Sequence, residues 1–259
     1  MTLEVKDLKF AYKKNPVLHG VNFAAKAGQF VCLLGENGAG KTTLFRCLLG
    51  LLGGYQGEIL IDGVNGKNFS VRELARKVAY IPQSNAPVFN YTVYEIVLMG
   101  TNVLKSGLRA PGRSEREVVR QALEMMNISR LADRGFAELS GGERQLTLIA
   151  RALAQKSRML VMDEPTANLD YGNQFRVMRQ VRRLAESGYL IVLSTHNPEH
   201  ALLYSDKVLV LKDGKAMMYG EPEVVLSPET IEKIYGVSVE LQKMQTKKGE
   251  VPVFVPCFE

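Results

Sequence analysis

Gly35-Glu36-Asn37-Gly38-Ala39-Gly40-Lys41-Thr42-Thr43 is the stretch around which the rest of the chain is organised. It fits the pattern G-x-x-x-x-G-K-[ST], in which a glycine-rich loop joins a strand to a helix. The apolar run 30–34 before it predicts a buried strand, and leucines at helical spacing after it predict a helix. Backbone N–H groups of such a loop turn toward a phosphate, and the helix N-terminus adds partial positive charge. We therefore predict a nucleotide site here.

Individual side chains of the loop have distinct expected roles. Lys41 is expected to reach the β- and γ-phosphates of the nucleotide, and the Thr42 hydroxyl to complete a Mg²⁺ shell. The predicted nucleotide contacts of the loop are Gly35, Asn37, Gly38, Ala39, Gly40, Lys41, Thr42 and Thr43.

Length and composition predict a globular protein. The 259 residues are 46% hydrophobic, enough for a substantial core in one domain or two closely joined lobes. No apolar run approaches the roughly 20 residues of a membrane helix, and Met1–Glu4 lacks the regions of a signal peptide. The net charge of +6 permits an anionic partner, but basic residues are scattered among acids, so we expect no nucleic acid. Three cysteines without metal-binding spacing suit a reducing cytosol.

The N-terminal third predicts an antiparallel β layer. Short strands are expected at 3–5, 8–12 and 21–23, separated by turns at Asn15-Pro16 and Ala27-Gly28. A further pair flanks the Asp62-Gly63 turn. Tyr12 fits either a plain strand aromatic or a platform on which an adenine ring stacks.

The middle of the chain predicts a helical lobe over about residues 89–155. Ser70 and Thr92 each stand three residues before a glutamate, the spacing of a capping box at a helix start. Between them, the strand 78–81 stops at Pro82-Gln83. Residues 105–116 are polar with Gly and Pro and predict a loop, whereas 117–126 predicts an amphipathic helix.

A second glycine-containing helix start lies at Ser140-Gly141-Gly142-Glu143. Ser140 and Glu143 have capping-box spacing, and by itself this pattern more often marks a simple helix cap. A small hydroxyl and two glycines at a helix start also favour anion binding. Because the same chain carries a phosphate loop, we predict a second anion site at Ser140, Gly141 and Gly142.

Acidic residues follow the second buried strand, at 159–162. Asp163 and Glu164 fall where parallel strands present ligands, so Asp163 is expected to hold Mg²⁺ through water and Glu164 to polarise the attacking water. A third buried strand, 190–193, leads to His196 at the same edge, where it is expected to hydrogen-bond a γ-phosphate. His19 and His200 are interpreted as structural or exposed. Toward the C-terminus we expect a hairpin over 208–219, a helix from Ser227 and a small final hairpin.

These motifs, in this order, resemble the ATP-binding subunit of ABC transporters over essentially residues 2–225. Tyr12 matches the adenine-stacking aromatic, 35–43 the Walker A loop, and Gln83 the Q-loop glutamine. Residues 139–145 are similar to the family signature, with Glu143 where many members have Gln. Residues 160–164 match Walker B, 168–170 the D-loop and His196 the switch histidine.

The resemblance implies an α/β fold: a P-loop NTPase core with a mixed sheet, an N-terminal antiparallel β subdomain and an inserted helical subdomain. It implies an ATP-binding domain over 1–225 and a short extension over 226–259. It also implies ATP and Mg²⁺ as ligands. Lys41, Gln83, Glu164 and His196 are then catalytic, and Thr42, Gln83 and Asp163 hold the metal.

For partners, the resemblance implies a head-to-tail homodimer at the cytoplasmic face of the cell membrane. It works with integral permease subunits and, indirectly, a substrate-binding protein. The permease is expected to dock near Gln83 and the apolar residues after it, Val88, Phe89 and Tyr91.

Residues 92–100, 131–134 and 234–237 further resemble the importers of iron chelates (siderophore or haem) and cobalamin. Importers of zinc, manganese or molybdate stay open as alternatives, as does a soluble ABC ATPase outside transport. An ATP-binding module without turnover and a nucleotide kinase fit the motifs less well.

Overall fold

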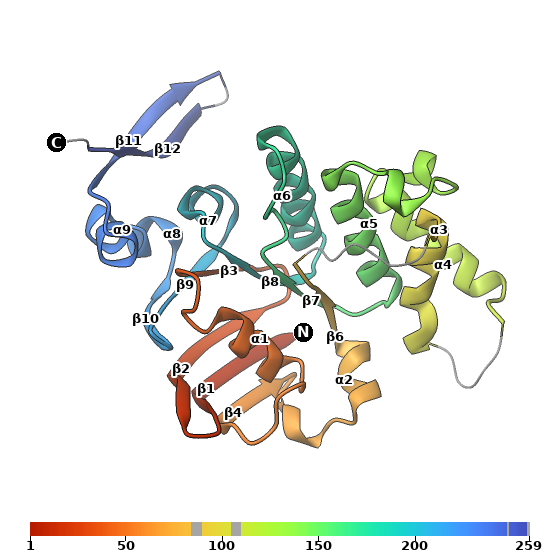
Figure 1. Ribbon diagram of the computed structural model, residues 1–259, viewed down its shortest axis with the longest axis horizontal. Helices are drawn as coiled ribbons and strands as arrows, with labels where there is room; N and C mark the ends of the chain where they lie inside the picture. The colour runs from red at the N-terminus through yellow and green to blue at the C-terminus, as the bar shows by residue number, and fades with distance from the viewer. Residues whose placement is uncertain (84–89, 105–109, 248, 258–259) are drawn as a thin grey trace.

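The computed structural model describes residues 1–83, 90–104, 110–247 and 249–257. An antiparallel β layer, a central mixed sheet and a set of helices are stacked on one another, with the C-terminal hairpin extending from one corner (Figure 1). The predicted fold class is thereby confirmed. None of the helices in the described ranges combines the length and apolar content needed to cross a bilayer.

The central sheet is formed mainly from the predicted apolar runs. Its strands are β3 (Phe30–Leu34), β6 (Val78–Ile81), β7 (Met159–Asp163), β8 (Leu190–Thr195), β9 (Lys207–Lys212) and β10 (Lys215–Gly220). Their order is β10-β9-β3-β8-β7-β6, with all neighbours parallel except the β9–β10 hairpin. In a sheet covered on both faces, continuous apolar runs are the expected strand sequences.

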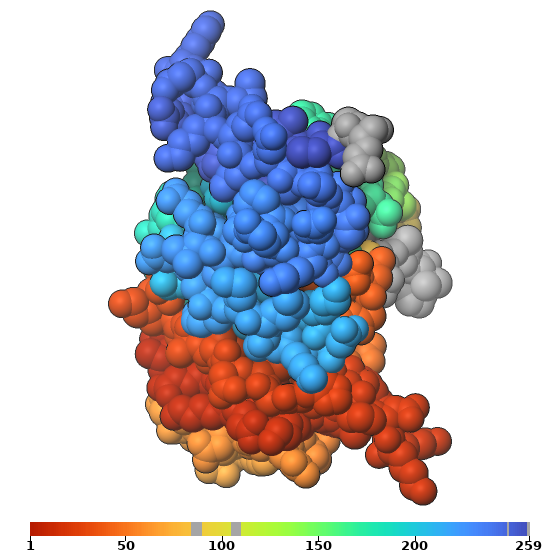
Figure 2. Space-filling view, turned by 90° about the vertical axis from the view of Figure 1, so that its left-hand side faces the viewer, coloured from red at the N-terminus to blue at the C-terminus, as the bar shows by residue number. Residues whose placement is uncertain are grey.

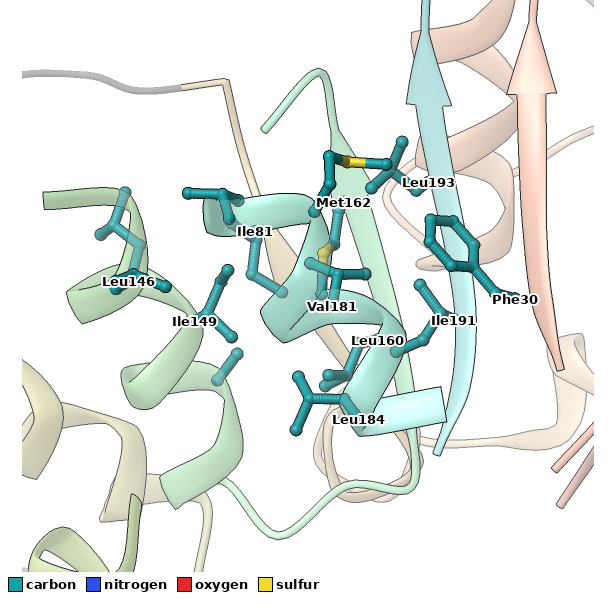
Figure 3. Packing of buried hydrophobic residues seen from close by; sticks show 14 of the residues in the cluster. Phe30, Ile81, Leu146, Ile149, Leu160, Met162, Val181, Leu184, Ile191 and Leu193 are labelled. Atoms are coloured by element: carbon teal, nitrogen blue, oxygen red, sulfur yellow. The ribbon is translucent and has the colours of Figure 1, made fainter. Parts of the chain in front are cut away.

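Both faces of this sheet are buried, which the alternation along β3 shows directly. Phe30, Cys32 and Leu34 belong to the core on the helical side, whereas Val31 and Leu33 face the antiparallel layer. On the helical side, residues of β6, β7 and β8 pack against α5 (Gly141–Ala154) and α6 (Tyr171–Glu186) (Figure 3). The sheet edge that carries the predicted site is therefore held by two cores.

The antiparallel layer has longer strands than predicted. Its members are β1 (Thr2–Tyr12), β2 (Asn15–Lys26), β4 (Gln56–Ile61) and β5 (Val64–Asn65), in the order β2-β1-β4-β5. The short strands expected at 3–5 and 8–12 are one strand, because a register shift around Asp7, whose φ is 45°, lets the pairing continue past the polar residues. The turn expected at Asn15-Pro16 lies at residues 13–14, and Asn15 already belongs to β2. Helix α1 (Lys41–Leu48) contributes to the core between this layer and the central sheet.

The helical lobe contains α3 (Val93–Gly100), α4 (Arg113–Met125) and α5. The capping boxes at Ser70, before α2 (Val71–Lys77), and at Thr92, before α3, are present as predicted. The loop expected over 105–116 is wrong in its last part, since α4 begins at Arg113. The Glu115 carboxylate accepts the Gly112 N–H at 2.9 Å, which starts the helix four residues earlier than the apolar pattern does. Single-turn 3-10 helices lie at Gly66–Asn68, Thr101–Leu104, Ser129–Leu131 and Phe136–Glu138.

The C-terminal part follows α7 (Pro198–Tyr204) and the β9–β10 hairpin. It contains α8 (Pro222–Val225), α9 (Pro228–Tyr235) and the antiparallel hairpin of β11 (Val239–Thr246) and β12 (Gly249–Pro256). Ser227 caps α9, and the final hairpin is present as predicted. The β11–β12 hairpin projects from one end of the molecule (Figure 2).

Candidate nucleotide site

Close contact at one position and left-handed backbone at two others favour glycine in the loop between β3 and α1. A Cβ on Gly35 would lie 2.3 Å from the Leu211 carbonyl oxygen. Gly38 and Gly40 have φ values of 84° and 100°, in the left-handed region that side chains disfavour. Gly40 is also the N-cap of α1, and within the described residues no side chain caps this helix. The backbone thus forms a cradle whose shape depends on the absence of Cβ atoms.

Lys41 is the first residue of α1, and its side chain is only 6% exposed. Its Nζ donates to the carbonyl oxygens of Gly35 at 2.7 Å and Glu36 at 3.1 Å, and it pairs with Glu164 Oε1 at 3.2 Å. An ammonium group has three protons to donate, and a buried one needs acceptors for them. The cation is therefore held inside the loop.

Asp163 ends β7 and connects three elements. Its Oδ2 accepts the Thr42 hydroxyl at 3.0 Å and lies 3.4 Å from the Tyr80 hydroxyl, while its Oδ1 accepts the Ser194 hydroxyl at 2.6 Å. Burial, reinforced by Asp163, raises the pKa of Tyr80 to about 12, so this phenol stays a donor. The carboxylate is thus oriented by hydroxyls from α1, β6 and β8.

Glu164 follows with a φ of 45°, a conformation that costs about 1–2 kcal/mol for a residue with a Cβ. Its N–H donates to Ser194 Oγ at 3.0 Å, and its carboxylate lies between the Lys41 ammonium and the His196 imidazole. Oε1 faces Lys41, and Oε2 lies 3.2 Å from His196 Nδ1. Strained backbone held by surrounding bonds is typical of functional sites. The carboxylate is 13% exposed and the His196 side chain 57%.

A cavity of about 390 Å³ opens onto these groups. It is lined by Val17, Glu36, Asn37, Gly38, Gly40, Lys41, Thr42, Thr43, Gln83, Asp163 and Glu164. Segments far apart in the sequence thus meet at one edge of the central sheet. The described lining does not include Tyr12, which is 39% exposed and packs edge-on against Phe10, with ring centroids 4.9 Å apart.

The second helix start, at Ser140, is outside this lining as the structure describes it. Ser140 caps α5 by accepting the Glu143 N–H, and the Glu143 carboxylate accepts the Ser140 N–H at 3.1 Å, so the predicted capping box is present. Gly142 allows close packing, because a Cβ there would lie 2.4 Å from Asn173 Oδ1 at the start of α6. The two predicted anion sites of one chain are therefore separate sites.

The residues at Asp163 fit a Mg²⁺ ion. Mg²⁺ prefers hard oxygen ligands and usually combines one or two carboxylates with phosphate oxygens and water. Thr42 Oγ1 and the Asp163 carboxylate supply such oxygens beside the phosphate cradle. Within the described ranges no three Asp, Glu, His or Cys side chains gather as a metal cluster.

Sequence reasoning missed four contributors to the site, one of which is Glu36, whose carbonyl oxygen accepts from Lys41. Ser194 orients Asp163 and supports Glu164, although it was visible as a polar residue ending a buried strand. Val17 and Tyr80 are ordinary strand residues, and no local signal distinguishes them. The predicted docking residues Val88 and Phe89 lie outside the described residues, whereas Tyr91 is 37% exposed.

Two other predictions concern histidines and cysteines. His200 is structural, with an exposed fraction of 2%, and burial lowers its pKa to about 4. Cys32 and Cys47 are buried, Cys257 is exposed, and none of these described cysteines forms a disulfide.

Comparison with known proteins agrees with this fold and site. The family model for ABC transporters matches residues 18–167. A petrobactin import ATP-binding protein, FpuC of Bacillus anthracis, is 35% identical over 255 residues, covering 98% of this chain and 92% of its own length. A hemin import ATP-binding protein, HmuV of Gloeobacter violaceus, is 36% identical over 247 residues (93% and 88%). The chain belongs to the ABC transporter family, as an ATP-binding subunit with ATPase activity coupled to transport.

Two further matches bear on the choice of cargo. A chain of a solved structure, described as an inward-facing conformation of a putative metal-chelate type ABC transporter, superposes with a TM-score of 0.88 at 32% identity, covering 100% of this chain and 98% of that one. A molybdate import ATP-binding protein, MolC of Haemophilus influenzae, is 33% identical over 259 residues (99% and 97%). Overall identity therefore does not separate iron chelates from molybdate.

Proposed function

We propose that this chain is the ATP-hydrolysing subunit of an importer and powers separate permease subunits in the membrane. Glu164 acts as the general base, and Lys41, Gln83 and His196 complete the catalytic set. These roles are supported by the position of the Glu164 carboxylate. It lies between Lys41 Nζ and His196 Nδ1, beside the phosphate cradle.

The chemistry of this arrangement is phosphoryl transfer to water. Such reactions depend on positioning and charge stabilisation rather than on covalent catalysis. Lys41 exchanges its carbonyl partners for β- and γ-phosphate oxygens, and the backbone of residues 35–43 donates to the phosphates. A bound Mg²⁺, held by Thr42, Gln83 and Asp163, would neutralise developing charge. Glu164 orients and deprotonates the attacking water, and His196 stays within reach of both Glu164 and the γ-phosphate.

For assembly, we propose a head-to-tail homodimer at the cytoplasmic face of the membrane. ATP then lies between the 35–43 loop of one subunit and Ser140, Gly141 and Gly142 of the other. The exposed position of Ser140, outside its own chain's cavity, supports this arrangement. Tyr12 is proposed to stack on the adenine, and the surface near Gln83 and Tyr91 to receive the permease. A substrate-binding protein delivers cargo to the permease.

For cargo, we propose an iron chelate, namely a siderophore complex or haem, with cobalamin in the same group. The petrobactin and hemin import relatives and the metal-chelate type structure support this choice. The MolC relative favours molybdate as the alternative. Uptake assays in a deletion strain, with ferric siderophore, haem, cobalamin and molybdate offered separately, distinguish these cargoes.

Glu164→Gln tests the catalytic proposal. The variant is expected to bind MgATP as the parent does and to hydrolyse it about 10²–10⁴-fold more slowly, the range for loss of a general base. Single-turnover hydrolysis of radiolabelled ATP gives the rate, and equilibrium titration gives the affinity. Glu73→Gln, which changes an exposed capping glutamate on α2, is the matched control and should hydrolyse normally. Turnover of Glu164→Gln within a few-fold of the parent would rule out the assignment.

A further inference from the structure

In the described part of the chain, a hydrogen bond connects the C-terminal extension to the segment that carries His196. The Tyr235 hydroxyl donates to the backbone carbonyl oxygen of His196 at 2.8 Å. Tyr235 is the last residue of α9, and the two residues are 39 positions apart in the chain. The acceptor belongs to the residue whose imidazole contacts Glu164.

His196 needs support because it lies just beyond the sheet. The pairing of β8 with β3 ends at Thr195, opposite Leu34. The residue after His196, Asn197, belongs to a local network: its N–H donates to Thr195 Oγ1 at 3.0 Å, and its side chain caps α7. His196 stands between the strand and the helix, and Tyr235 binds its main chain from outside this segment.

Tyr235 is itself held firmly. Its ring is partly buried and packs against the core on the helical side of the sheet. The Lys212 ammonium donates to the Lys233 carbonyl oxygen at the end of α9, and Gly236, with φ at 68°, ends the helix directly after Tyr235. Burial, together with Cys32, Glu36 and Glu164 nearby, raises the pKa of the Tyr235 phenol well above its ordinary value. The hydroxyl therefore remains protonated and available as a donor.

The hairpin beyond Tyr235 contacts the same segment from another side. Strand β12 packs against α7, which begins two residues after His196. Phe254 of β12 also packs against the core on the helical side of the sheet. Residues 196–204 thus lie between the sheet edge and the extension, as the arrangement of α7, α9 and β12 shows (Figure 1).

We propose that Tyr235 is a positioning residue for ATP hydrolysis: its hydroxyl holds the main chain of His196, and through it the imidazole at Glu164. The proposal rests on the roles given above to Glu164 and His196. It assigns the extension a part in turnover, although the extension is outside the nucleotide cavity as described.

Tyr235→Phe in the full-length chain tests this role, because it removes the hydroxyl and keeps the ring. Loss of one hydrogen bond predicts a fall in kcat of roughly three- to ten-fold. The KM for ATP should stay within about two-fold of the parent, since Tyr235 does not line the phosphate cradle. Amide hydrogen exchange over residues 196–200 should become faster.

Tyr219→Phe is the matched control. The Tyr219 hydroxyl donates to the Ala24 carbonyl oxygen and joins β10 to β2, so this variant loses the same kind of bond away from Glu164 and His196. Its kcat should equal that of the parent. Thermal unfolding of both variants shows that each is folded.

A double-mutant cycle with His196→Ala separates positioning from general stability. In single turnover, Tyr235→Phe should slow hydrolysis in the parent and change nothing further in the His196→Ala background. Equal slowing in both backgrounds, or a Tyr235→Phe rate equal to that of Tyr219→Phe, would overturn the positioning role. Parent-like rates for Glu164→Gln and His196→Ala would instead overturn the catalytic assignments on which it rests.

Discussion

The two glycine-containing helix starts of this chain, at α1 and at α5, look alike in sequence and differ in structure. Helix α1 begins after a left-handed Gly40, has no side-chain cap among the described residues, and starts with a lysine that is 6% exposed. Helix α5 begins after an exposed Ser140 whose hydroxyl and Glu143 form a capping box. Only the α1 start lines the described cavity.

The difference shows how one local motif serves two purposes. At α1 the N-terminal amides are left for a ligand, and the cation needed beside a phosphate is built in. At α5 the chain's own side chains satisfy two of the end groups and add a negative charge. The first start combines an uncapped helix end and a buried lysine within one chain, as the proposed phosphate site requires. The second is an exposed helix end that suits contact with a ligand held elsewhere, as the proposed dimer requires.

The two helix starts also differ in charge, because α5 carries Glu143 in its first turn. The hydrogen bond from the Ser140 N–H is the main reason that the pKa of Glu143 lies below its ordinary value. The carboxylate is therefore charged at neutral pH. Arg130 lies 3.3 Å from it, with side-chain exposures of 67% for the arginine and 14% for the glutamate. In the proposed dimer, the arginine therefore offsets a charge that would otherwise repel the triphosphate held by the partner subunit.

The largest expected effect comes from Lys41→Ala, which removes the buried cation at the start of α1. Loss of a buried, charge-assisted contact predicts roughly ten- to hundred-fold weaker MgATP binding, with loss of turnover. Isothermal titration measures the affinity, and Lys207→Ala, which removes a lysine paired with an exposed glutamate, is the control. Normal affinity of the Lys41 variant would remove the contrast between the two helix starts.

A mixed dimer tests the same comparison by restoring ATP affinity. The expected gain is similar in size to the loss caused by Lys41→Ala. Lys41→Ala and Ser140→Arg are each expected to abolish turnover alone. In a heterodimer isolated by two affinity tags, one site combines the intact loop of the second variant with the intact Ser140 of the first. That site should bind ATP with near-normal affinity. If Ser140 served its own chain's nucleotide, every site would carry one defect and no such site would appear.

The smallest expected effect comes from Glu143→Gln. Glutamine can still complete a capping box, so the helix start is kept and only the charge is lost. We expect ATP-dependent dimerisation of the Glu164→Gln protein to tighten by roughly two- to five-fold at low salt, with less effect at high salt because dissolved ions screen interactions between charges. Analytical ultracentrifugation measures it, and Glu73→Gln, in the equivalent box on α2, should change nothing. Weaker dimerisation would contradict the electrostatic argument.

Much of the fold could be predicted because its signals are local. The apolar runs at β3, β7 and β8 and the capping boxes at Ser70, Thr92 and Ser140 occur where the sequence places them. The errors arose where another signal, either strand pairing or a helix cap, competes with the local apolar pattern. Strand β1 continues past Asp7 because pairing with β2 and β4 resumes beyond it. Helix α4 starts early because Gly112 and Glu115 begin it before its apolar face appears.

For the site, spacing along the chain was enough to select Lys41, Thr42, Asp163, Glu164 and His196, because strand ends and helix starts place adjacent residues predictably. Their convergence depends on sheet order, which brings β3, β8 and β7 side by side. Only that tertiary arrangement brings Ser194 to Asp163 and leaves Tyr12 outside the described lining.

The sequence by itself determined the two helix starts and the strand ends, because these depend on residues within one turn or one strand. The tertiary structure decided that the α1 start is enclosed and the α5 start exposed, and that Tyr235 meets His196. Such contacts join segments tens of residues apart. They follow from how the layers pack, and no local pattern encodes them.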